Sequence, residues 1–368
     1  MPTRSKPRIR KSTPAKPVSL KVIAEHLGLS VATISIVIND APAARSIPQE
    51  TKDRVLKAAE ELNYRPNFFA RSLRRKRTFT VAVIVPEISE GYAASIMSGI
   101  EDRLLQEGYL YFVASHRGKP DLIDEYPEFL VDRGVEGFVL VNTPLTHDLP
   151  VPVVSIASET QSAKQTTIRL NNDTACKLAL EHLANLGHKQ IAFFKGHPGS
   201  ADTELRWNGI CRAASELGIE IKPELVVQLR SRHDSPEPST PEEGYYYAQR
   251  LLESKQRFTA FFAFNDISAI GAIRAFCDAG YRVPEDISVV GFDDIQAAAF
   301  QIPRLTTIKQ PLRHMGELAA STLLARIGSS DHKREVIMVE PKLVVRESTC
   351  AVTKKAALST SASAGRRK

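Results

Sequence analysis

A short segment near the start of the chain has the spacing of a DNA-reading helix pair. Residues 18–39 read VSLKVIAEHLGLSVATISIVIN. Ser19 is a favourable N-cap for a first helix, Gly28 ends that helix, and Ser30 caps a second helix over Val31–Ile38. In such a motif the second helix presents its first residues to base edges in the major groove. The spacing indicates a helix-turn-helix, and an ordinary helical hairpin is the alternative interpretation.

The helix pair needs apolar faces that hold it against a third helix, which we expect over residues 49–63. Residues 40–48, rich in Ala and Pro, are expected to form a loop before it. Ala24 is the small residue that lets the first two helices cross closely. The side chains expected on the three apolar faces are Val22, Ile23, Leu27, Ile34, Val37, Ile38, Val55, Leu56, Ala59 and Leu62.

A basic segment, YRPNFFARSLRRKRT, follows at residues 64–78. Asn67 can cap a short helix in which Phe69, Ala70 and Leu73 share one face. A helix this short and basic would be marginal in water by itself. Two interpretations stay open: the segment is ordered by a partner chain and DNA, or it is a frayed linker.

Charge is distributed unevenly along the 368 residues. Residues 1–80 hold 17 Lys and Arg against 6 Asp and Glu, and residues 350–368 hold 5 against none. The residues between them hold 27 basic against 36 acidic side chains. This pattern favours a polyanionic partner for the N-terminal part. Both ends, residues 1–17 and 350–368, are low in complexity and are expected to be disordered.

Cysteine usage and hydropathy favour a cytoplasmic protein without a membrane partner. The only apolar pattern near the N-terminus contains Lys21, Glu25 and His26, which excludes a signal-peptide core, and no apolar run reaches membrane-spanning length. The cysteines lie far apart and make no metal-ligand pair, so we expect reduced, partly buried thiols. They are Cys176, Cys211, Cys277 and Cys350.

From residue 79 onward, short apolar runs alternate with amphipathic helices, which is typical of buried parallel strands in an α/β fold. The runs TVAVIVPEI, LYFVASH, GVEGFVLVN and VPVVSIA begin the first of two doubly wound lobes. Further strands are expected at 190–195, 225–229, 260–264 and 287–292. Helices are expected at 93–107, 122–131, 174–186, 203–217, 242–253, 267–279 and 312–327. We expect residues 303–311 to cross back to the first lobe and residues 335–345 to form one outer strand there.

The sequence resembles the LacI/GalR family of bacterial transcription regulators from residue 18 to about residue 346. Seven motifs occur in the order and spacing of that family. They are SxxTxSxxIN at 30–39, LNYRPN at 62–67, ARSL at 70–73, LGH at 186–188, FND at 264–266, ISVVGFDD at 287–294 and LTTIKQP at 305–311.

The resemblance implies a homodimer with three parts. An all-α helix-turn-helix headpiece spans residues 18–65, a hinge helix and linker that fold on the operator span residues 66–78, and a core shaped like a periplasmic sugar-binding protein spans residues 79–349. The partners it implies are a double-stranded DNA operator and a small-molecule effector between the two lobes of the core. No cofactor is implied, and a dimer on DNA predicts a pseudo-palindromic site.

In the family's pattern, Val31, Ala32 and Ile36 stand at the positions that reach base edges. All three are apolar, and Ile36 departs from the Arg or His that often stands there. Such side chains contact thymine methyl groups but take no guanine acceptor. Specificity must therefore depend also on the hinge and on other groups such as Arg45. The alternative for Ile36 is packing within the headpiece.

The resemblance also assigns residues to the DNA backbone and to the minor groove. In the hinge, Leu73 matches the residue that wedges into the minor groove and Ala70 lies on the groove floor, whereas Phe68 departs from the usual polar residue. Each residue assigned to phosphates has an alternative role as a helix cap or a solvated side chain. The phosphate-contacting positions are Ser19, Ser30, Thr33, Ser35, Asn39, Tyr64 and Asn67.

Polar side chains at the carboxyl ends of predicted strands suggest where an effector binds, since ligands of open α/β lobes bind there. Asn265 and Asp266 follow one strand and Asp293 follows another, and Asp266 has an alternative role as a helix N-cap. The resemblance adds Arg206 as a group that binds ligand oxygens, with Tyr92 and Trp207 as apolar surface. Two departures from the family's pattern leave fewer polar side chains for a ligand. The loop at residues 88–92 reads ISEGY where an Asn-Pro pair is common, and Ala157 stands where an acidic residue is usual.

Several alternatives remain open for the ligand and the class of protein. A sugar or polyol is the leading prediction, a purine or phosphorylated metabolite is second, and a core that has lost sensing is a third. The sequence does not decide between inducer and corepressor. The sequence contains no catalytic motif that would support an enzyme, because GxSxG, GxxxxGK[ST], GxGxxG, HExxH and CxxC are all absent. A secreted or cytoplasmic solute-binding protein without operator specificity would suit the core but not the attached headpiece.

Overall fold

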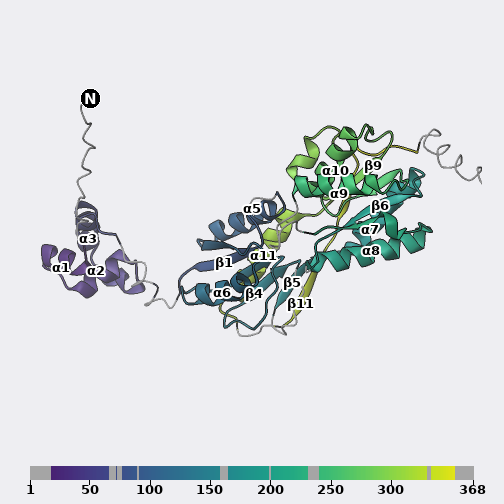
Figure 1. Ribbon diagram of the computed structural model, residues 1–368. Helices are drawn as coiled ribbons and strands as arrows, with labels where there is room; N and C mark the ends of the chain where they lie inside the picture. The colour runs from purple at the N-terminus through teal and green to yellow at the C-terminus, as the bar shows by residue number, and fades with distance from the viewer. Residues whose placement is uncertain are drawn as a thin grey trace, which may run out of the picture. The chain divides into compact units, whose positions relative to one another are not determined.

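The computed structural model describes residues 18–65, 72, 77–88, 91–157, 165–198, 200–230, 240–329 and 333–352. The chain divides into two compact units, Met1–Arg77 and Thr78–Lys368. Figure 1 shows the helical first unit in purple and the α/β second unit in blue to yellow. We call residues 18–65 the headpiece and residues 78–352 the core. Residues 1–17 and 353–368 of the tails predicted to be disordered, and nearly all of the predicted hinge helix, lie outside the described residues. Residues 350–352, predicted as the start of the C-terminal tail, are instead hydrogen-bonded to the core, since the Cys350 N–H donates to Ser288 Oγ and the Val352 N–H donates to the Leu186 carbonyl.

The headpiece is a three-helix unit with a small apolar centre. Its elements are α1 (Leu20–Leu27), α2 (Val31–Ile38), the 3₁₀-helix η1 (Pro42–Ser46) and α3 (Gln49–Glu61). The predicted end of α1 is confirmed, because Gly28 has φ +67° and donates its backbone N–H to the Ala24 carbonyl. The buried centre consists of Ile23, Ala24, Ile34, Val37, Val55 and Ala58.

Three details predicted for the headpiece are wrong. Val22 is 42% exposed and Leu56 is 52% exposed, although both were assigned to apolar faces. Each is adjacent to a fully buried residue, Ile23 or Val55, and adjacent helical positions differ by about 100° in direction. Only one of each pair therefore faces the centre. The expected loop at 40–48 contains η1, whose first residue Pro42 is compatible with a helix start.

Two compositional predictions have mixed outcomes. All four cysteines are unpaired, but only Cys176 is buried and Cys350 half-buried, whereas Cys211 and Cys277 are exposed. Among the described residues no single helix is long and apolar enough to cross a membrane. The pair α1 and α2 meets the criterion of length and composition only together, across a bend of 113°.

The first lobe is a parallel sheet with the strand order β11-β5-β4-β3-β1-β2. Helices α5 (Gly91–Gln106) and α11 (Leu312–Arg326) pack together on one face, and α6 (Pro120–Val131) covers the other (Figure 1). Alternate residues of β1 follow this division: Val83 packs with the α5 and α11 side, and Ile84 with the α6 side. The strands are β1 (Thr80–Val85), β2 (Leu110–Ser115), β3 (Phe138–Val141), β4 (Val153–Ile156), β5 (Thr166–Leu170) and β11 (Glu335–Val339).

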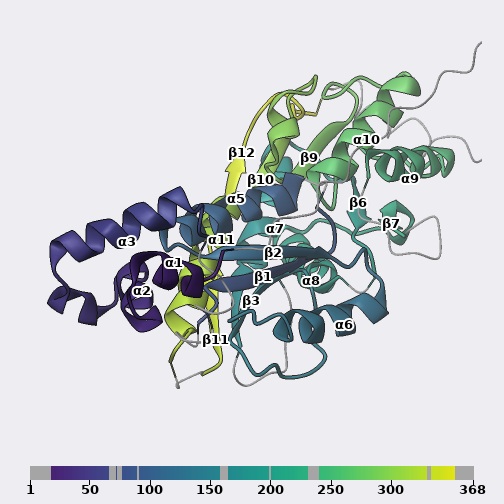
Figure 2. The ribbon, with the colours of Figure 1, turned by 90° about the vertical axis from the view of Figure 1, so that its left-hand side faces the viewer.

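The second lobe repeats this arrangement with the order β12-β10-β9-β8-β6-β7, in which only β12 is antiparallel to its neighbour. Helices α7 (Asn172–Asn185) and α8 (Ala201–Leu217) cover one face, and α9 (Pro241–Glu253) and α10 (Asp266–Asp278) cover the other (Figure 2). The strands are β6 (Ile191–Lys195), β7 (Val226–Gln228), β8 (Ala260–Phe262), β9 (Ser288–Asp293), β10 (Thr306–Lys309) and β12 (Lys342–Val344), and η2 (Pro223–Leu225) and η3 (Gln296–Ala299) lie between them.

The crossings between the lobes differ from the prediction in two places. Residues 335–345 form two short strands rather than one, since β11 joins the first-lobe sheet and β12 joins the second. Strand β5 was not predicted, because its sequence TTIRL is too polar to stand out as an apolar run. The prediction that residues 303–311 cross back to the first lobe is confirmed. Strand β10 belongs to the second-lobe sheet, and the next helix, α11, packs on α5 of the first lobe.

Candidate DNA-reading surface and effector cavity

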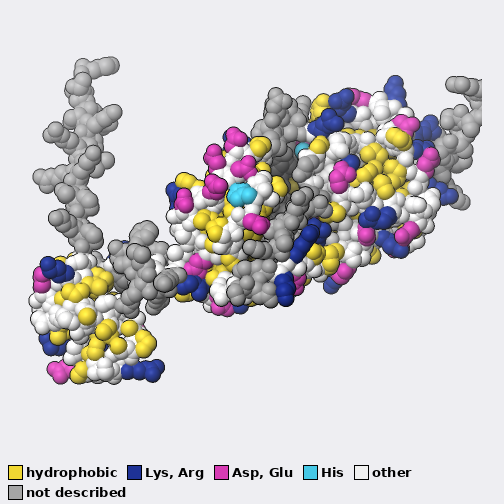
Figure 3. Space-filling model, turned by 90° about the horizontal axis from the view of Figure 1, so that it is seen from below, with side chains coloured by type: hydrophobic (Ala, Val, Ile, Leu, Met, Phe, Trp, Pro, Cys, Tyr) yellow, Lys and Arg dark blue, Asp and Glu magenta, His cyan; other side chains and the backbone are white. Residues whose placement is uncertain are grey.

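Helix α2 exposes apolar side chains at its start. Val31 is 45% exposed, and Ala32 is also exposed. Ile36 is half-buried but does not belong to the hydrophobic centre of the headpiece, so the alternative that it serves headpiece packing gains no support. Figure 3 shows one face of the headpiece on which apolar side chains gather, with Lys and Arg at the margins. The exposed apolar side chains at the start of α2 suit contact with thymine methyl groups.

The two serine N-caps of the headpiece differ. The Ser30 Oγ accepts a hydrogen bond from the Thr33 backbone N–H at 3.0 Å and lies 2.8 Å from the Thr33 hydroxyl. Ser19 has the extended backbone of an N-cap, yet its side chain makes no capping hydrogen bond. The first turn of α1 therefore keeps backbone N–H groups that can donate hydrogen bonds to a phosphate.

The other polar residues assigned to phosphates have structural contacts as well. The Asn39 amide donates to the Ser35 carbonyl at 2.7 Å, which caps the end of α2. Tyr64 packs against the headpiece centre, and its backbone N–H donates to the Ala59 carbonyl at 2.8 Å. The hinge residues assigned to DNA, Asn67, Ala70 and Leu73, lie outside the described residues.

A cavity of about 370 Å³ separates the two lobes of the core. Carboxyl ends of strands from both sheets reach it, as the predicted effector position requires. Four of the six effector residues predicted from sequence line it, namely Tyr92, Arg206, Asn265 and Asp293. The other lining residues with polar side chains are Glu87, His116, Arg117, Asn142, His197, Ser200 and Asp202.

Arg206 is the central cation of this cavity. It lies on α8, is 4% exposed, and its guanidinium carbon is 3.6 Å from the centre of the Phe292 ring and 4.5 Å from that of Phe264. One terminal nitrogen donates to the Phe264 carbonyl, whereas Nε is buried without a hydrogen-bond partner in the described part of the chain. A guanidinium in contact with two aromatic rings and with an unused N–H is well placed to donate to a ligand oxygen.

Two carboxyl groups accompany Arg206. Burial raises the pKa of Asp293 to about 7, although Arg206 and a hydrogen bond from Gln310 oppose the rise. The Gln310 amide donates to Asp293 Oδ1 at 2.7 Å. Burial also raises the pKa of Asp202, with Arg206 and Arg169 acting in the opposite direction. Near neutral pH the charge of Asp293 is therefore only partly present, and burial also shifts Asp202 toward its neutral form.

The first-lobe wall adds uncharged polar groups. The Tyr92 hydroxyl and Asn142 Oδ1 are both buried, and their side chains face each other as donor and acceptor, with no other partner for either atom among the described residues. Burial and the nearby Asp202 and Asp293 raise the pKa of Tyr92, so its hydroxyl stays a donor. Asn142 and Asp293 also have φ of +44° and +115°, values rare for residues other than glycine. Strained backbone at two lining positions is typical of binding sites.

Trp207 does not line the cavity, contrary to the prediction. It neighbours Arg206 on α8, and adjacent helical residues point about 100° apart, so both cannot face the same space. Its ring packs edge-on against Phe193, with ring centres 6.0 Å apart, and the Lys195 ammonium lies 5.7 Å from it. Trp207 therefore stabilises the packing of α8 on the sheet.

Asp266 also lies away from the cavity and has a structural role. Its carboxylate accepts hydrogen bonds from the Thr307 hydroxyl at 2.6 Å and from the Ile295 backbone N–H at 2.9 Å. The side chain is fully buried, and burial raises its pKa. The N-cap of α10 is Asn265 rather than Asp266, since Asn265 forms a reciprocal capping box with Ser268.

Sequence reasoning missed several lining residues that have a recognisable signal. His116, Asn142 and His197 each follow the end of a strand, the same criterion that identified Asn265. His116 is buried and its pKa is lowered by burial to about 4, so its imidazole is neutral. Ala157, at the end of β4 with φ +54°, is buried and does not line the cavity. Part of the ISEGY loop lies outside the described residues.

Comparisons with known proteins agree with both units. Residues 19–67 match bacterial regulatory proteins of the lacI family, and residues 180–349 match a periplasmic binding protein-like domain. The chain is 33% identical over 338 residues to the HTH-type transcriptional repressor PurR of Mannheimia succiniciproducens, which covers 90% of this chain and 98% of that relative.

Solved structures extend the similarity to the whole fold. The lac repressor dimer bound to operator and the anti-inducer ONPF is 28% identical, has a TM-score of 0.79, and covers 91% of this chain and 100% of its own. A LacI family transcriptional regulator from Enterococcus faecium with bound ribose is 26% identical with a TM-score of 0.66, covering 74% of this chain and 100% of its own. A CelR–cellobiose complex is 27% identical with a TM-score of 0.65, covering 90% and 99%.

Proposed function

The chain belongs to the LacI family of DNA-binding transcriptional repressors, and we propose that it binds a pseudo-palindromic operator as a homodimer under the control of a sugar or polyol. The observation that carries the effector part is the convergence of Asp202, Arg206, Asp293, Asn142 and Tyr92 on one interlobe cavity. Vicinal hydroxyl groups donate to the carboxyl and amide oxygens and accept from the guanidinium and phenol. The ribose and cellobiose bound to two similar regulators support this class.

A purine base is the second candidate for the effector. The rings of Tyr92 and Phe264 line the same cavity, and a flat heterocycle stacks on such surfaces. A phosphorylated metabolite is less compatible, because its phosphate would approach the buried carboxyl groups of Asp202 and Asp293.

Operator reading is proposed to combine α2 with the hinge. Val31, Ala32 and Ile36 contact base edges, and Leu73 wedges into the minor groove with Ala70 on its floor. Phosphates are bound by the remaining polar positions assigned from sequence, so they add affinity without adding sequence preference. Those positions are Ser19, Ser30, Thr33, Ser35, Asn39, Tyr64 and Asn67.

Replacing Leu73 by Ala should weaken operator binding about tenfold more than nonspecific binding, because the wedge contributes only where the groove opens. Fluorescence anisotropy with operator and scrambled duplexes at equal salt measures both affinities. Equal losses on the two duplexes would exclude the wedge role.

Exposed apolar side chains on the core support the homodimer. The edge strand β2 exposes Leu110 and Phe112, and the segment after η3 exposes Phe300 and Ile302, the last at 93%. Clusters of exposed apolar side chains are a mark of interaction surfaces, and a two-fold dimer would cover the same residues on both chains. Sedimentation should give a dimer, and a tetramer or a monomer would contradict the proposal.

The first experiment is selection of genomic fragments by the full-length protein at about 0.15 M salt, a concentration that suppresses weak phosphate binding. The selected fragments are then bound with and without sugars, polyols, purine bases and sugar phosphates. A short palindrome whose binding changes with one sugar or polyol supports the proposal and gives the sign of the response. Weak binding without sequence preference would contradict it, as a solute-binding protein predicts.

A further inference from the structure

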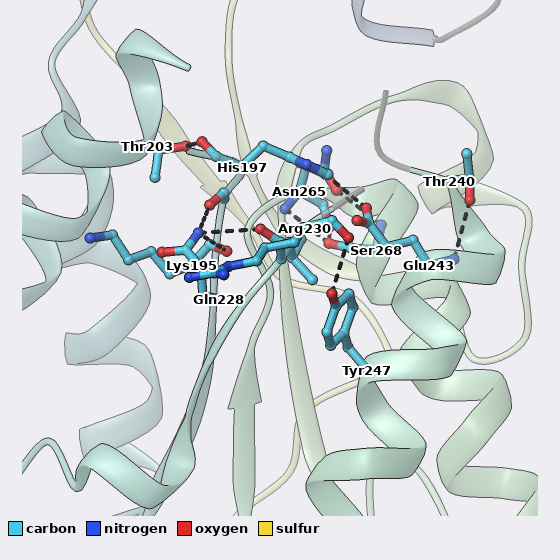
Figure 4. Close-up of polar contacts among 12 residues, drawn as sticks. Lys195, His197, Thr203, Gln228, Arg230, Thr240, Glu243, Tyr247, Asn265 and Ser268 are labelled. Atoms are coloured by element: carbon cyan, nitrogen blue, oxygen red, sulfur yellow. Dashed lines mark hydrogen bonds and ion pairs between the residues drawn. The ribbon is translucent and has the colours of Figure 1, made fainter. Parts of the chain in front are cut away.

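One lining residue of the cavity is held from behind by a buried acid. His197 follows β6 and is 19% exposed, and its Nε2 lies 2.9 Å from Oε2 of Glu243, which is 7% exposed. Figure 4 shows the imidazole directed toward Glu243 in the first turn of α9, beside Asn265 and Ser268 at the start of α10. Oε1 of Glu243 is buried and has no hydrogen-bond partner within the described ranges.

Glu243 is held in place by the packing of α9 on α10. The Thr240 hydroxyl accepts a hydrogen bond from the Glu243 backbone N–H at 3.2 Å, which caps α9. A Cβ on Gly244 would lie 2.3 Å from the Ser268 carbonyl oxygen, so the helices approach more closely there than any other residue permits. The same first turn of α10 carries Asn265 into the cavity, so both helices position lining residues through one rigid contact.

The contact with Glu243 determines which ring nitrogen of His197 is protonated. A carboxylate only accepts hydrogen bonds, so the contact requires a proton on Nε2, and in the neutral tautomer with that proton Nδ1 is an acceptor. No hydrogen bond reaches Nδ1 from the described part of the chain. Together with the oxygens of Asp202, Asp293 and Asn142, this nitrogen makes the cavity rich in acceptors.

We propose that His197, oriented by Glu243, is a specificity-determining residue of the effector site that accepts a hydrogen bond from a hydroxyl group of a neutral polyol. This inference rests on the proposed function, and it extends the ligand from the cluster around Arg206 to the loop that follows β6. Glu243 acts through His197 and is a positioning residue. A ligand rich in donors fits these acceptors, whereas a phosphate group, which only accepts near neutral pH, does not.

The test begins with calorimetric titration of the full-length protein with D-ribose, D-glucose, D-mannitol and cellobiose. For the compound that binds best, His197→Ala should lose about five- to tenfold in affinity, the usual effect of one lost hydrogen bond. Glu243→Ala should lose a similar factor, and Glu243→Gln, which still accepts from Nε2, should recover most of it. The matched controls His314→Ala and Glu242→Ala lie outside the cavity and should keep the affinity of the parent protein.

A second measurement separates recognition from folding. Singly deoxygenated analogues of that compound should include one that binds the parent protein and His197→Ala equally, because it lacks the hydroxyl that donates to Nδ1. Nuclear magnetic resonance of ¹⁵N-histidine-labelled protein should place the His197 proton on Nε2, and a proton on Nδ1 would overturn the proposed orientation. If a sugar binds the parent and His197→Ala alike, His197 has no recognition role although the proposed function stands. If no sugar or polyol binds the parent protein, the effector class fails and the role of His197 falls with it.

Discussion

The headpiece is proposed to read DNA with exposed side chains on one short helix, whereas the interlobe cavity gathers buried polar groups from separate segments of the core. Val31 and Ala32 lie on the surface, while Arg206, Asp202 and Asp293 are each less than a tenth exposed. A contact made at an exposed side chain exchanges with water and contributes little by itself. A buried charge that loses its partner is costly to the protein.

This difference between exposed and buried functional groups predicts which substitutions should remove the function of each unit. The headpiece has a small centre and depends on a few apolar residues for its fold, while its DNA contacts are individually weak. The core has large apolar clusters that tolerate changes in the cavity, so its function depends on a few charges instead. Single substitutions should therefore remove DNA binding through folding in one unit and ligand binding through electrostatics in the other.

The largest expected effect is that of Ile34→Ala on the headpiece. Ile34 is fully buried at the centre of the three helices, and truncation of such a residue costs about 2–5 kcal/mol. A unit this small does not have that margin, so operator binding should be lost at 37 °C while the core keeps its melting temperature. Circular dichroism and operator binding by anisotropy measure the two effects.

Val31→Ala provides the matched control for this substitution. Val31 lies on the same helix and is exposed, so its truncation should change headpiece stability by less than about 0.5 kcal/mol. If Ile34→Ala loses operator binding with an intact headpiece, or if Val31→Ala destabilises the headpiece as much as Ile34→Ala does, the claim that Ile34 acts through folding is wrong.

Replacing Arg206 by Met tests the opposite claim for the cavity. Methionine keeps a long apolar side chain against the rings of Phe264 and Phe292 but leaves Asp202 and Asp293 without their cation. Effector affinity should fall about 100-fold, or about 2.7 kcal/mol, with effector-free operator binding retained. The control is Arg212→Met, whose exposed ion pair with Asp173 contributes little. Equal loss in both variants would show that the cavity charges are not decisive.

Local signals in the sequence predicted the headpiece well. The bounds of α2 agree with the prediction because Ser30 and Gly28 act on adjacent residues, and such capping and turn signals need no distant partner. The burial of individual side chains was harder to predict. Val22 and Leu56 fit an amphipathic pattern, yet only packing against the other helices decides which of two adjacent apolar residues is buried.

The cavity was predictable only in part because its residues come from distant strands. Arg206 was found through the family resemblance and Asp293 through its place after a predicted strand, whereas His197 and Asn142 were missed although both follow strand ends. Trp207 is adjacent to Arg206 on α8 and points toward Phe193 on the sheet instead of into the cavity. The division of residues 335–345 into β11 and β12 depends on two different sheets, which no local pattern reports.

The pH dependence of effector binding sharpens the contrast between exposed and buried groups. Burial raises the pKa of Asp293 to about 7, and a polyol hydroxyl donates best to the ionised carboxylate. Affinity should therefore be full above this pKa and fall about tenfold from pH 8 to pH 6. His116, whose pKa is about 4, stays neutral over this range. Calorimetric titration at pH 6, 7 and 8 measures the slope.

The stability of the effector-free core should change in the opposite direction with pH. Because the folded state holds on Asp293 a proton that the unfolded chain releases near pH 4, this contribution is present at low pH. It is lost as pH rises through about 7, and Asp202, whose pKa is also raised, acts in the same sense. If the affinity for the effector and the stability of the effector-free core both rose with pH, the raised pKa of Asp293 in the folded core would be contradicted.

The smallest expected effects separate the two serine caps of the headpiece. Ser30 accepts a hydrogen bond from the Thr33 N–H, so Ser30→Ala should cost about 1 kcal/mol of headpiece stability. Ser19 makes no such bond, so Ser19→Ala should leave stability within about 0.5 kcal/mol and weaken binding to operator and nonspecific DNA equally, as a phosphate contact does. Thermal unfolding combined with anisotropy on both duplexes distinguishes them. A stability loss for Ser19→Ala as large as that for Ser30→Ala would mean that Ser19 acts as a cap, and the exposed first turn of α1 would then lose its proposed role at the phosphate backbone.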